Sequence, residues 1–266
     1  MKNRDANRYT QILEAIFARH FKKGATEIEF ERTEFGQVAN ELGIALPKNL
    51  GDVLYSFRYR TLLPKSITTK APRDHEWIIR PAGKGRYKLV VVKQANIVPS
   101  NILAETKIPD ATPGVISKYS MNDEQSLLAK LRYNRLVDIF TGLTCYSLQN
   151  HLRTTLRDSS QVETDEIYIG LDKRGAHYVL PVQAKGGKDK IGVVQIEQDF
   201  EMCAFKFPIL TCRSIAAQFI DNNLIALFEF EQSTDGIKVS SEKHYHLVRP
   251  DELSPEELQS YSIRQS

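Results

Sequence analysis

The sequence contains few cysteines and no long apolar run. Its three cysteines share no Cys-x-x-Cys spacing and lie in apolar segments, at Cys145, Cys203 and Cys212. A disulfide scaffold or a zinc ribbon is therefore not expected, and the chain suits a reducing cytoplasm. No stretch approaches the roughly 18 to 20 apolar residues of a membrane-spanning helix, and the first residues, MKNRDANR, lack the apolar core of a signal peptide. We expect a cytoplasmic protein without a membrane partner.

Several common catalytic and ligand-binding motifs are also missing. The sequence has no Gly-x-Ser-x-Gly and no His-Glu-x-x-His, which disfavours the common esterases and zinc proteases. The segment Gly83-Lys84-Gly85 is too short for a nucleotide-binding loop. His244 and His246 alternate along an expected strand, but the sequence places no third ligand beside them. A transition-metal site is therefore not favoured.

The composition is that of a folded protein with an uneven charge distribution. Of the 266 residues, 41% are hydrophobic and 26% charged, which suits one large domain or two modest ones. The formal net charge is +3, yet residues 1–100 hold 18 basic and 10 acidic side chains, and residues 101–266 hold 18 and 23. Within Gly51 to Lys93, ten Lys and Arg face three acids, with five aromatic residues interleaved. Such a patch favours a polyanion, although a solvated basic face is the simpler alternative.

The first 93 residues show the pattern of a small helical domain with a hairpin. Apolar spacing predicts a helix over residues 6–22, a second capped by Thr33 and ending at Gly43, and a third opened by Pro47 and Asn49. Strands are expected at residues 27–30, 77–80 and 87–92, the last two joined by the glycine-containing turn 82–86. This order of elements is typical of a winged helix-turn-helix domain, which we predict for residues 1–93.

A winged helix suggests which residues contact DNA. Its third helix enters the major groove, and its hairpin loop meets phosphate or the minor groove. Arginine can read guanine, whereas Lys84 is expected to hold phosphate. Some winged helices bind only proteins, so the fold does not by itself determine DNA binding. The candidate DNA contacts are Lys48, Asn49, Tyr55, Arg58 and Arg60 from the third helix, Lys84 and Arg86 from the hairpin, and Lys188.

A second domain is expected over residues 121–266. Residues 94–120 contain three prolines and no sustained periodicity, which predicts a linker with a short extended piece. The first helix of the second domain would be capped by Asn122, with Gln125 reaching back, and end near Gly142. A helix from Thr144 to Leu156 would follow, then strands at 162–171 and 177–185, a helix over 192–205, strands at 211–220, 224–231 and 243–248, and a short helix from Ser254.

The two adjacent strands carry a carboxylate and, across the hairpin, a Gln-x-Lys pair. Residues i and i+2 of a strand share a face, so Gln183 and Lys185 are expected to project together, and hairpin pairing can bring Asp165 beside them. Magnesium prefers hard oxygen ligands, which Asp165, the Gln183 side chain and the Ala184 carbonyl could supply. The simpler alternative is an ordinary cross-strand ion pair between Asp165 and Lys185.

At these positions the chain resembles the PD-(D/E)XK nuclease superfamily, over roughly residues 121–230. Asp165 matches the first acid of that pattern, Gln183 the second acid and Lys185 the lysine. Gln183 departs from the usual acid and removes one negative charge. Glu163, or its neighbour Glu166, could compensate, and Glu124 matches a position where many members place a further carboxylate.

The resemblance implies a fold and a reaction. The expected fold class is α/β (α+β): a winged helix-turn-helix domain followed by a restriction-endonuclease-like mixed β-sheet flanked by helices. The expected activity is hydrolysis of double-stranded DNA with Mg²⁺, or Mn²⁺ as a substitute, by a sequence-specific homodimer like a type II restriction enzyme. The catalytic candidates are Asp165, Gln183, Lys185, Glu163 and Glu124. The alternatives are a structure-specific repair or recombination nuclease, and a winged-helix regulator whose second domain has lost its chemistry.

Overall fold

The computed structural model describes residues 2–47, 50–59, 61–121, 123–157, 161–187, 189–234 and 236–263. Contacts divide the chain into two compact units. The N-terminal unit comprises Met1–Ile97, Thr154–Gln161 and Gly192–Val194, and the C-terminal unit comprises the remaining segments. In the part of the chain that is described, no helix is both long and apolar enough to cross a bilayer.

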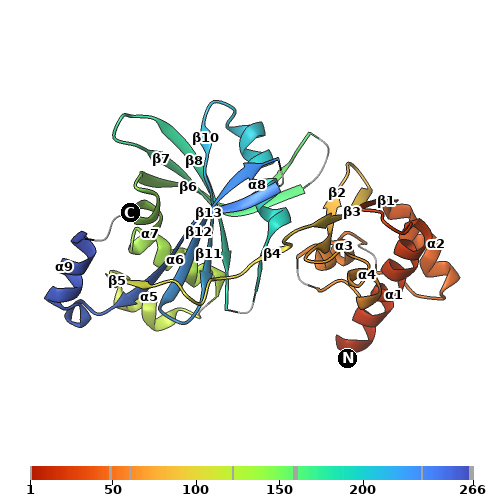
Figure 1. The fold of residues 1–266 in the computed structure, drawn as a ribbon, viewed down its shortest axis with the longest axis horizontal. Helices are drawn as coiled ribbons and strands as arrows, with labels where there is room; N and C mark the ends of the chain where they lie inside the picture. Colours follow the sequence, from red (N-terminus) through yellow and green to blue (C-terminus); the bar gives the residue numbers. More distant parts are fainter. Residues whose placement is uncertain are drawn as a thin grey trace. The chain divides into compact units, whose positions relative to one another are not determined.

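The N-terminal unit combines four helices with a three-stranded antiparallel sheet (Figure 1). The helices are α1 (Lys2–His20), α2 (Arg32–Glu41), α3 (Leu50–Tyr59) and the short α4 (Lys65–Thr68). The strands β1 (Glu27–Glu31), β2 (Glu76–Pro81) and β3 (Arg86–Val92) pair in the order β1-β3-β2. Apolar residues of all seven elements share one core, in which the rings of Phe17 and Trp77 meet edge to face. Sequestering these apolar faces from water stabilises the unit.

The predicted helices and strands of this unit are confirmed, with one correction at a helix end. The predicted opening of the third helix at Asn49 lies outside the described residues, and α4 was not predicted. Glu31, and not Thr33, is the N-cap of α2. The carboxylate of Glu31 accepts the backbone N–H of Glu34, and the carboxylate of Glu34 accepts the backbone N–H of Glu31, at 2.8 Å. This reciprocal pair is a capping box, which Glu can form as Ser or Thr do. Leu42 lies beyond the helix and is exposed.

The C-terminal unit is built on a mixed sheet of eight strands flanked by helices (Figure 1). The main order is β5-β13-β12-β11-β8-β7-β6, with β10 beside β8. Strand β8 pairs parallel to β11 and antiparallel to β7, and β13 pairs parallel to β5. The strands are β5 (Glu105–Pro109), β6 (Thr144–Thr155), β7 (Gln161–Leu171), β8 (His177–Lys185), β10 (Thr211–Cys212), β11 (Ser214–Phe219), β12 (Leu224–Ser233) and β13 (Gly236–Val248). The fold is thus mixed α/β, as predicted, and β8 lies inside the sheet between β7 and β11.

Further short elements complete the chain. They are β4 (Asn96–Ile97), β9 (Ile191–Gly192), α5 (Gly114–Tyr119), α6 (Glu124–Tyr133), α7 (Leu136–Thr141), α8 (Val193–Lys206), a 3-10 turn (Pro250–Glu252) and α9 (Pro255–Ile263). Helices α6 and α7 pack their leucines onto one face of the sheet, against Leu180, Val182 and Ala184 of β8. Strand β5 lies inside the segment that was predicted as a linker.

The first predicted helix of this unit is two helices. Asp123 caps α6, since its carboxylate accepts the backbone N–H of Ser126 at 2.9 Å. Asn122, the predicted cap, lies outside the described residues. The helix ends at Tyr133, and Arg135 then has a φ of +49°. This left-handed residue cannot continue a helix, so a new one begins at Leu136.

The helix predicted from Thr144 to Leu156 is wrong, because these residues form strand β6. The prediction rested on a four-residue spacing of leucines, but Tyr146 and Leu148 are exposed and do not form a helical core stripe. The segment contains three threonines and Tyr146, residue types that favour strands. Pairing at the edge of the sheet, next to β7, decides its conformation.

Candidate active site

A group of buried polar side chains lies where the ladder between β7 and β8 ends. The backbone pairing runs from Leu171↔His177 to Glu166↔Val182, yet both strands continue past that point. Beyond it, Asp165 Oδ2 accepts the backbone N–H of Ala184 at 2.8 Å, and Gln183 Nε2 donates to the carbonyl of Glu163 at 3.2 Å. Side chains therefore replace the ladder and occupy the space between the two strands.

The regular alternation of β7 breaks at Asp165. Thr164 and Glu166 are two residues apart, so a regular strand would place them on one face. Instead, Thr164 donates to Asp199 on α8, whereas Glu166 contacts Ser147 on β6 and Arg132 on α6. The break directs the Asp165 carboxylate across to β8. Glu166, which could have replaced the missing acid, is held by these partners on another side of the strand.

Asp165 combines burial with a nearby positive charge. Burial raises the pKa of its carboxyl, while the charge of Lys185 and the N–H of Ala184 oppose this rise. The Ala184 contact uses Oδ2, and none of the described groups donates to Oδ1. One carboxylate oxygen is thus held in place and the other remains a possible ligand for a cation.

Gln183 is oriented by an acid that was not predicted. Its Nε2 lies 3.1 and 3.0 Å from the two carboxylate oxygens of Asp199, and Thr164 Oγ1 donates to the same carboxylate at 2.6 Å. An amide facing a carboxylate must present its nitrogen, so the Gln183 oxygen points away from Asp199. Asp199 is fully buried, and burial raises its pKa to about 7, against the opposing hydrogen bonds from Thr164 and Gln183.

Lys185 and Glu124 form a mostly buried ion pair. The Nζ of Lys185, at the end of β8, lies 3.3 Å from Oε1 of Glu124, in the first turn of α6. The lysine side chain is 11% exposed and the glutamate 40%. Within the described ranges there is no ion pair between Lys185 and Asp165, so the simple cross-strand pair is not what the structure contains. The polar ends of Gln183 and Lys185, expected to project together, contact residues of different helices.

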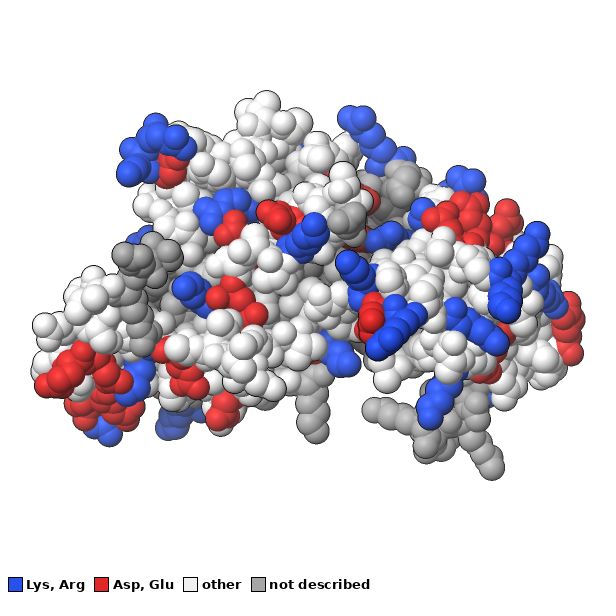
Figure 2. Space-filling model, viewed as in Figure 1, with Lys and Arg blue, Asp and Glu red and all other residues white. Residues whose placement is uncertain are grey.

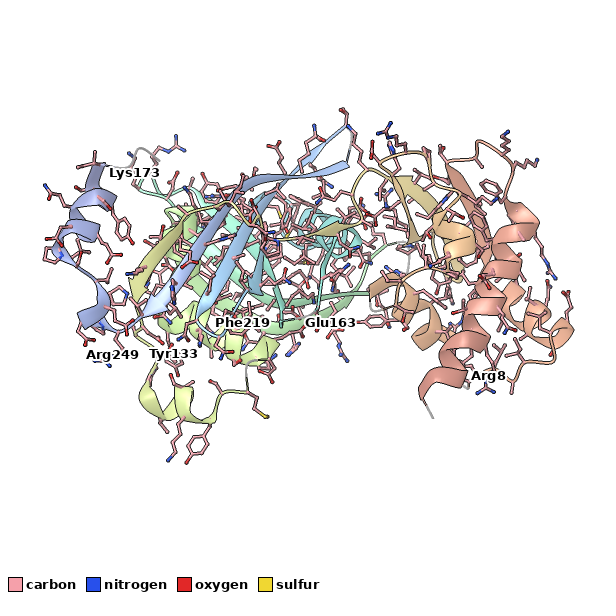
Figure 3. The ribbon with its side chains drawn as sticks, turned by 60° about the horizontal axis from the view of Figure 1, so that its bottom comes forward. Arg8, Tyr133, Glu163, Lys173, Phe219 and Arg249 are labelled. Carbon is pink, nitrogen blue, oxygen red and sulfur yellow. The ribbon has the colours of Figure 1, made fainter. Side chains whose placement is uncertain are left out.

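Glu163 faces β6. Its carboxylate pairs with Arg153 at 2.9 Å and lies 3.9 Å from Nδ1 of His151 (Glu163 is labelled in Figure 3). His151 has a φ of +49°, and Gln125 of α6 approaches its Nε2 at 2.8 Å. A positive φ is strained for histidine. The charge of Glu163 also raises the pKa of Asp165, so the two carboxylates lie near one another.

The donor set suits a hard cation. Among the residues that the structure describes, no three or more His, Cys, Asp and Glu side chains are grouped to hold a metal ion. Mg²⁺ does not require such a group, because it is usually held by one or two carboxylates with water and substrate phosphate. Asp165 Oδ1 and the Gln183 amide oxygen fit this chemistry. The Ala184 carbonyl remains a prediction, since the contact found for Ala184 is through its N–H.

The structure places the predicted DNA contacts in two groups. Lys84 and Arg86 flank the turn between β2 and β3. Tyr55 is partly exposed on α3 and Arg58 is half-buried there. Lys48, Asn49, Arg60 and Lys188 lie outside the described residues.

The helical pattern over residues 192–205 could have indicated Asp199 as a buried acid. The predicted helix over residues 192–205 is apolar on one stripe, at Ile196, Met202 and Cys203, which are buried. Asp199 occupies this stripe at a three-residue spacing from Ile196 and Met202. An acid on a buried helical stripe must have a partner, because an unpaired buried charge is unfavourable.

Comparison with family models, curated proteins and solved structures finds no match to this chain. The function is therefore argued from the geometry.

Proposed function

We propose that the chain is a metal-dependent nuclease of the PD-(D/E)XK type, which hydrolyses phosphodiester bonds of double-stranded DNA. The observation that carries this proposal is the end of the β7–β8 ladder, where the Asp165 carboxylate reaches the backbone N–H of Ala184, the residue between Gln183 and Lys185. The charge of Lys185 acts on the carboxyl groups of both Asp165 and Asp199. A cross-strand ion pair that only stabilised the sheet would not require this set of contacts.

The chain's own residues have separate roles in this proposal. Asp165 and the Gln183 oxygen would hold Mg²⁺ or Mn²⁺, which when bound polarises the scissile phosphate and acidifies water. Asp199 is the acid that contacts Gln183, at the place where the family pattern has its second acid, and with a pKa of about 7 it carries its full negative charge only above that pH. Glu163 is engaged with Arg153, so we infer a supporting role for Glu163.

Lys185 would act on the water and on the phosphate. Its ammonium group is held by Glu124 at 3.3 Å and is mostly shielded from solvent. In this position it can orient the attacking water and balance the charge that builds up on phosphate as a P–O bond to the leaving oxygen breaks. Glu124 would then be a positioning residue that keeps the lysine side chain extended toward the site.

The N-terminal unit has the element order of a DNA-binding domain. Helices α1 to α3 and the β2–β3 hairpin of the N-terminal unit follow the order of a winged helix, and we propose that this unit recognises DNA. Sequence-specific cleavage like that of a type II restriction enzyme follows from joining such a reader to a hydrolytic site. Cutting both strands then favours a homodimer, in which each copy supplies one site.

A cleavage assay tests the proposal directly. Purified protein is incubated with supercoiled plasmid and Mg²⁺, Mn²⁺ or EDTA, and the ends of the products are sequenced. We expect metal-dependent discrete fragments. Lys185→Ala and Asp165→Ala should each reduce cleavage at least about 10³-fold, as loss of a group that stabilises the transition state does.

The matched control is Lys173→Ala, which removes the same charge from the exposed turn at the other end of the hairpin (Figure 3). It should cut like the unmodified protein. Nicking at branched DNA only would indicate a structure-specific nuclease. DNA binding without cleavage under any metal condition would favour the regulator and contradict the proposed reaction. Unchanged cleavage by Lys185→Ala would remove Lys185 from the mechanism.

A further inference from the structure

An open pocket lies in the N-terminal unit, and none of its lining residues belongs to the candidate active site. It has a volume of about 490 Å³ and is lined by Glu31, Arg32, Thr33, Leu50, Lys84, Gly85 and Arg86. These residues come from the β1–α2 junction, the start of α3 and the turn of the β2–β3 hairpin. The pocket is open to solvent, so a ligand bound here would stay partly exposed.

The pocket wall is fixed by backbone contacts. The N–H of Arg32 donates to the carbonyl of Gly85 at 2.8 Å, and Glu31 lies opposite Arg86 in the β1–β3 register. The two segments that carry the cations are therefore held together. Gly85, with a φ of +70°, has open space where a side chain would begin, so a ligand can approach the backbone there.

Three cations of this pocket lack partners of their own. Arg32, Lys84 and Arg86 form no side-chain hydrogen bond or ion pair with any described residue. Figure 2 shows that Lys and Arg side chains stand over the visible face of the N-terminal unit, with acidic ones between them. In contrast to the three pocket cations, Lys88 of the same hairpin has an ion-pair partner, because its Nζ lies 3.3 Å from Oε2 of Glu27.

The acid in the pocket does not neutralise them. The Glu31 carboxylate caps α2 through the backbone N–H of Glu34 and also accepts the hydroxyl of Thr33 at 3.0 Å. This arrangement also closes the N-terminus of α2, so that helix end is not the feature that attracts a ligand. Three positive charges against one engaged carboxylate favour an anionic ligand.

We propose that this pocket binds the phosphate ester of a nucleotide. The phosphate would lie against Arg32, Lys84 and Arg86, since guanidinium groups match phosphate oxygens in geometry and lysine adds a point charge. The sugar or base would pack on Leu50, the apolar part of the wall. Two sources share this chemistry: a phosphate of a nucleic-acid backbone and a free nucleotide. For a nucleic-acid backbone, the inference deepens and rests on the proposed recognition of DNA by this unit. Binding of a free nucleotide here would require neither that recognition nor the metal site.

The test measures binding of the full chain without metal, in EDTA. Anisotropy of a fluorescein-labelled DNA duplex is followed over a range of KCl concentrations, with AMP, adenosine and inorganic phosphate as competitors. The variant is Arg32→Gln, Lys84→Gln and Arg86→Gln combined. The matched control is Arg8→Gln, Lys22→Gln and Lys23→Gln, which removes the same charge from exposed positions of the same unit outside the basic patch Gly51 to Lys93. Thermal unfolding checks that both variants fold. If the combined pocket variant does not fold, the three single substitutions are tested instead.

We expect the pocket variant to bind duplex at least about 10-fold more weakly than the control variant. The decrease of its log binding constant with log salt concentration should become shallower by about 0.9, as expected for the loss of one phosphate contact. If AMP competes, adenosine does not, and the pocket variant loses AMP binding, the source is a free nucleotide. If AMP does not compete while the duplex effect holds, the source is the nucleic-acid backbone. Equal duplex and AMP binding by the pocket and control variants would overturn the proposal, whether or not the protein cleaves DNA.

Discussion

The polar group at the end of the β7–β8 ladder and the basic pocket of the N-terminal unit use charge in opposite ways. In the first, Asp165, Lys185 and Asp199 are buried and each has a partner from another segment. In the second, Arg32, Lys84 and Arg86 are at least partly exposed and lack side-chain partners among the described residues. Buried charges need their neighbours for the fold to form, whereas unpaired surface charges are available to a ligand. Equal substitutions should therefore affect stability in one region and binding in the other.

The largest effect on stability is expected from Gln183→Glu. This change places a second carboxylate against the fully buried Asp199, whose oxygens lie 3.0 and 3.1 Å from the Gln183 nitrogen. Because two carboxylates would then face each other in a buried place, we expect the free energy of unfolding to fall by about 3 kcal/mol. Urea denaturation at pH 8 measures the loss.

The combined variant Gln183→Glu with Asp199→Asn separates charge from shape. It exchanges the two side-chain types across the same contact, so the hydrogen bond is restored in reverse. We expect stability to return to within about 1 kcal/mol of the unmodified protein, since a well-formed hydrogen bond contributes about that much. If the double variant were as unstable as Gln183→Glu alone, the amide and the carboxylate could not be exchanged across this contact, and charge would not explain the loss.

A smaller loss is expected from Thr164→Val, which keeps the shape and removes the hydroxyl that donates to Asp199 at 2.6 Å. The free energy of unfolding should fall by about 1.5 kcal/mol, because a buried hydrogen bond to a charged group is lost. The hydroxyl lowers the pKa of Asp199, so its removal should raise that pKa further. Carboxyl chemical shifts followed over pH would show this, and an unchanged titration would contradict the contact.

The pH dependence of stability should reveal Asp199 itself. Its pKa is about 7 in the folded chain, against a usual value of 3.8. Between these values the folded state keeps a proton that the unfolded state has released, so this group's contribution to stability falls as pH rises through that window, and changes little above it. Asp199→Asn should remove this slope. Denaturation curves from pH 4.5 to 8 test this. If the unmodified protein and Asp199→Asn showed parallel dependence of stability on pH, the pKa of Asp199 would not be raised by burial.

The smallest effect on stability is expected in the basic pocket. Arg86→Gln removes a charge without breaking an ion pair or a side-chain hydrogen bond, so the unfolding free energy should change by no more than about 0.5 kcal/mol. The same substitution should weaken DNA binding. Thermal unfolding and duplex anisotropy on one preparation compare the two effects. A marked loss of stability would mean that the pocket cations support the fold, and that the contrast between the regions is false.

Much of the fold could be predicted from local pattern. The helix over residues 6–22 and the hairpin strands around residues 77–92 have clear periodicity and turn residues, and the structure has them. The strands bearing Asp165 and Lys185 were found for the same reason. The segment 144–156 could not be predicted in this way, because its leucine spacing suits a helix and only the adjacent edge of β7 makes it a strand. The break after Tyr133 likewise depends on how α7 packs on the sheet.

The candidate site was predictable only in its residue types. The spacing of Asp165, Gln183 and Lys185 could suggest oxygen ligands and a lysine on neighbouring strands, but not their partners. Asp199 comes from a helix that follows these strands, and Glu124 from one that precedes them, so neither partnership is visible in local sequence.

Sequence alone determined the positions of most helices and strands and the basic character of the first hundred residues, since these depend on near-neighbour periodicity and on composition. Tertiary structure decided which charges are buried, which way the Gln183 amide faces, and which cations keep no partner. These properties arise from contacts between segments far apart in the chain, where desolvation and geometry act together.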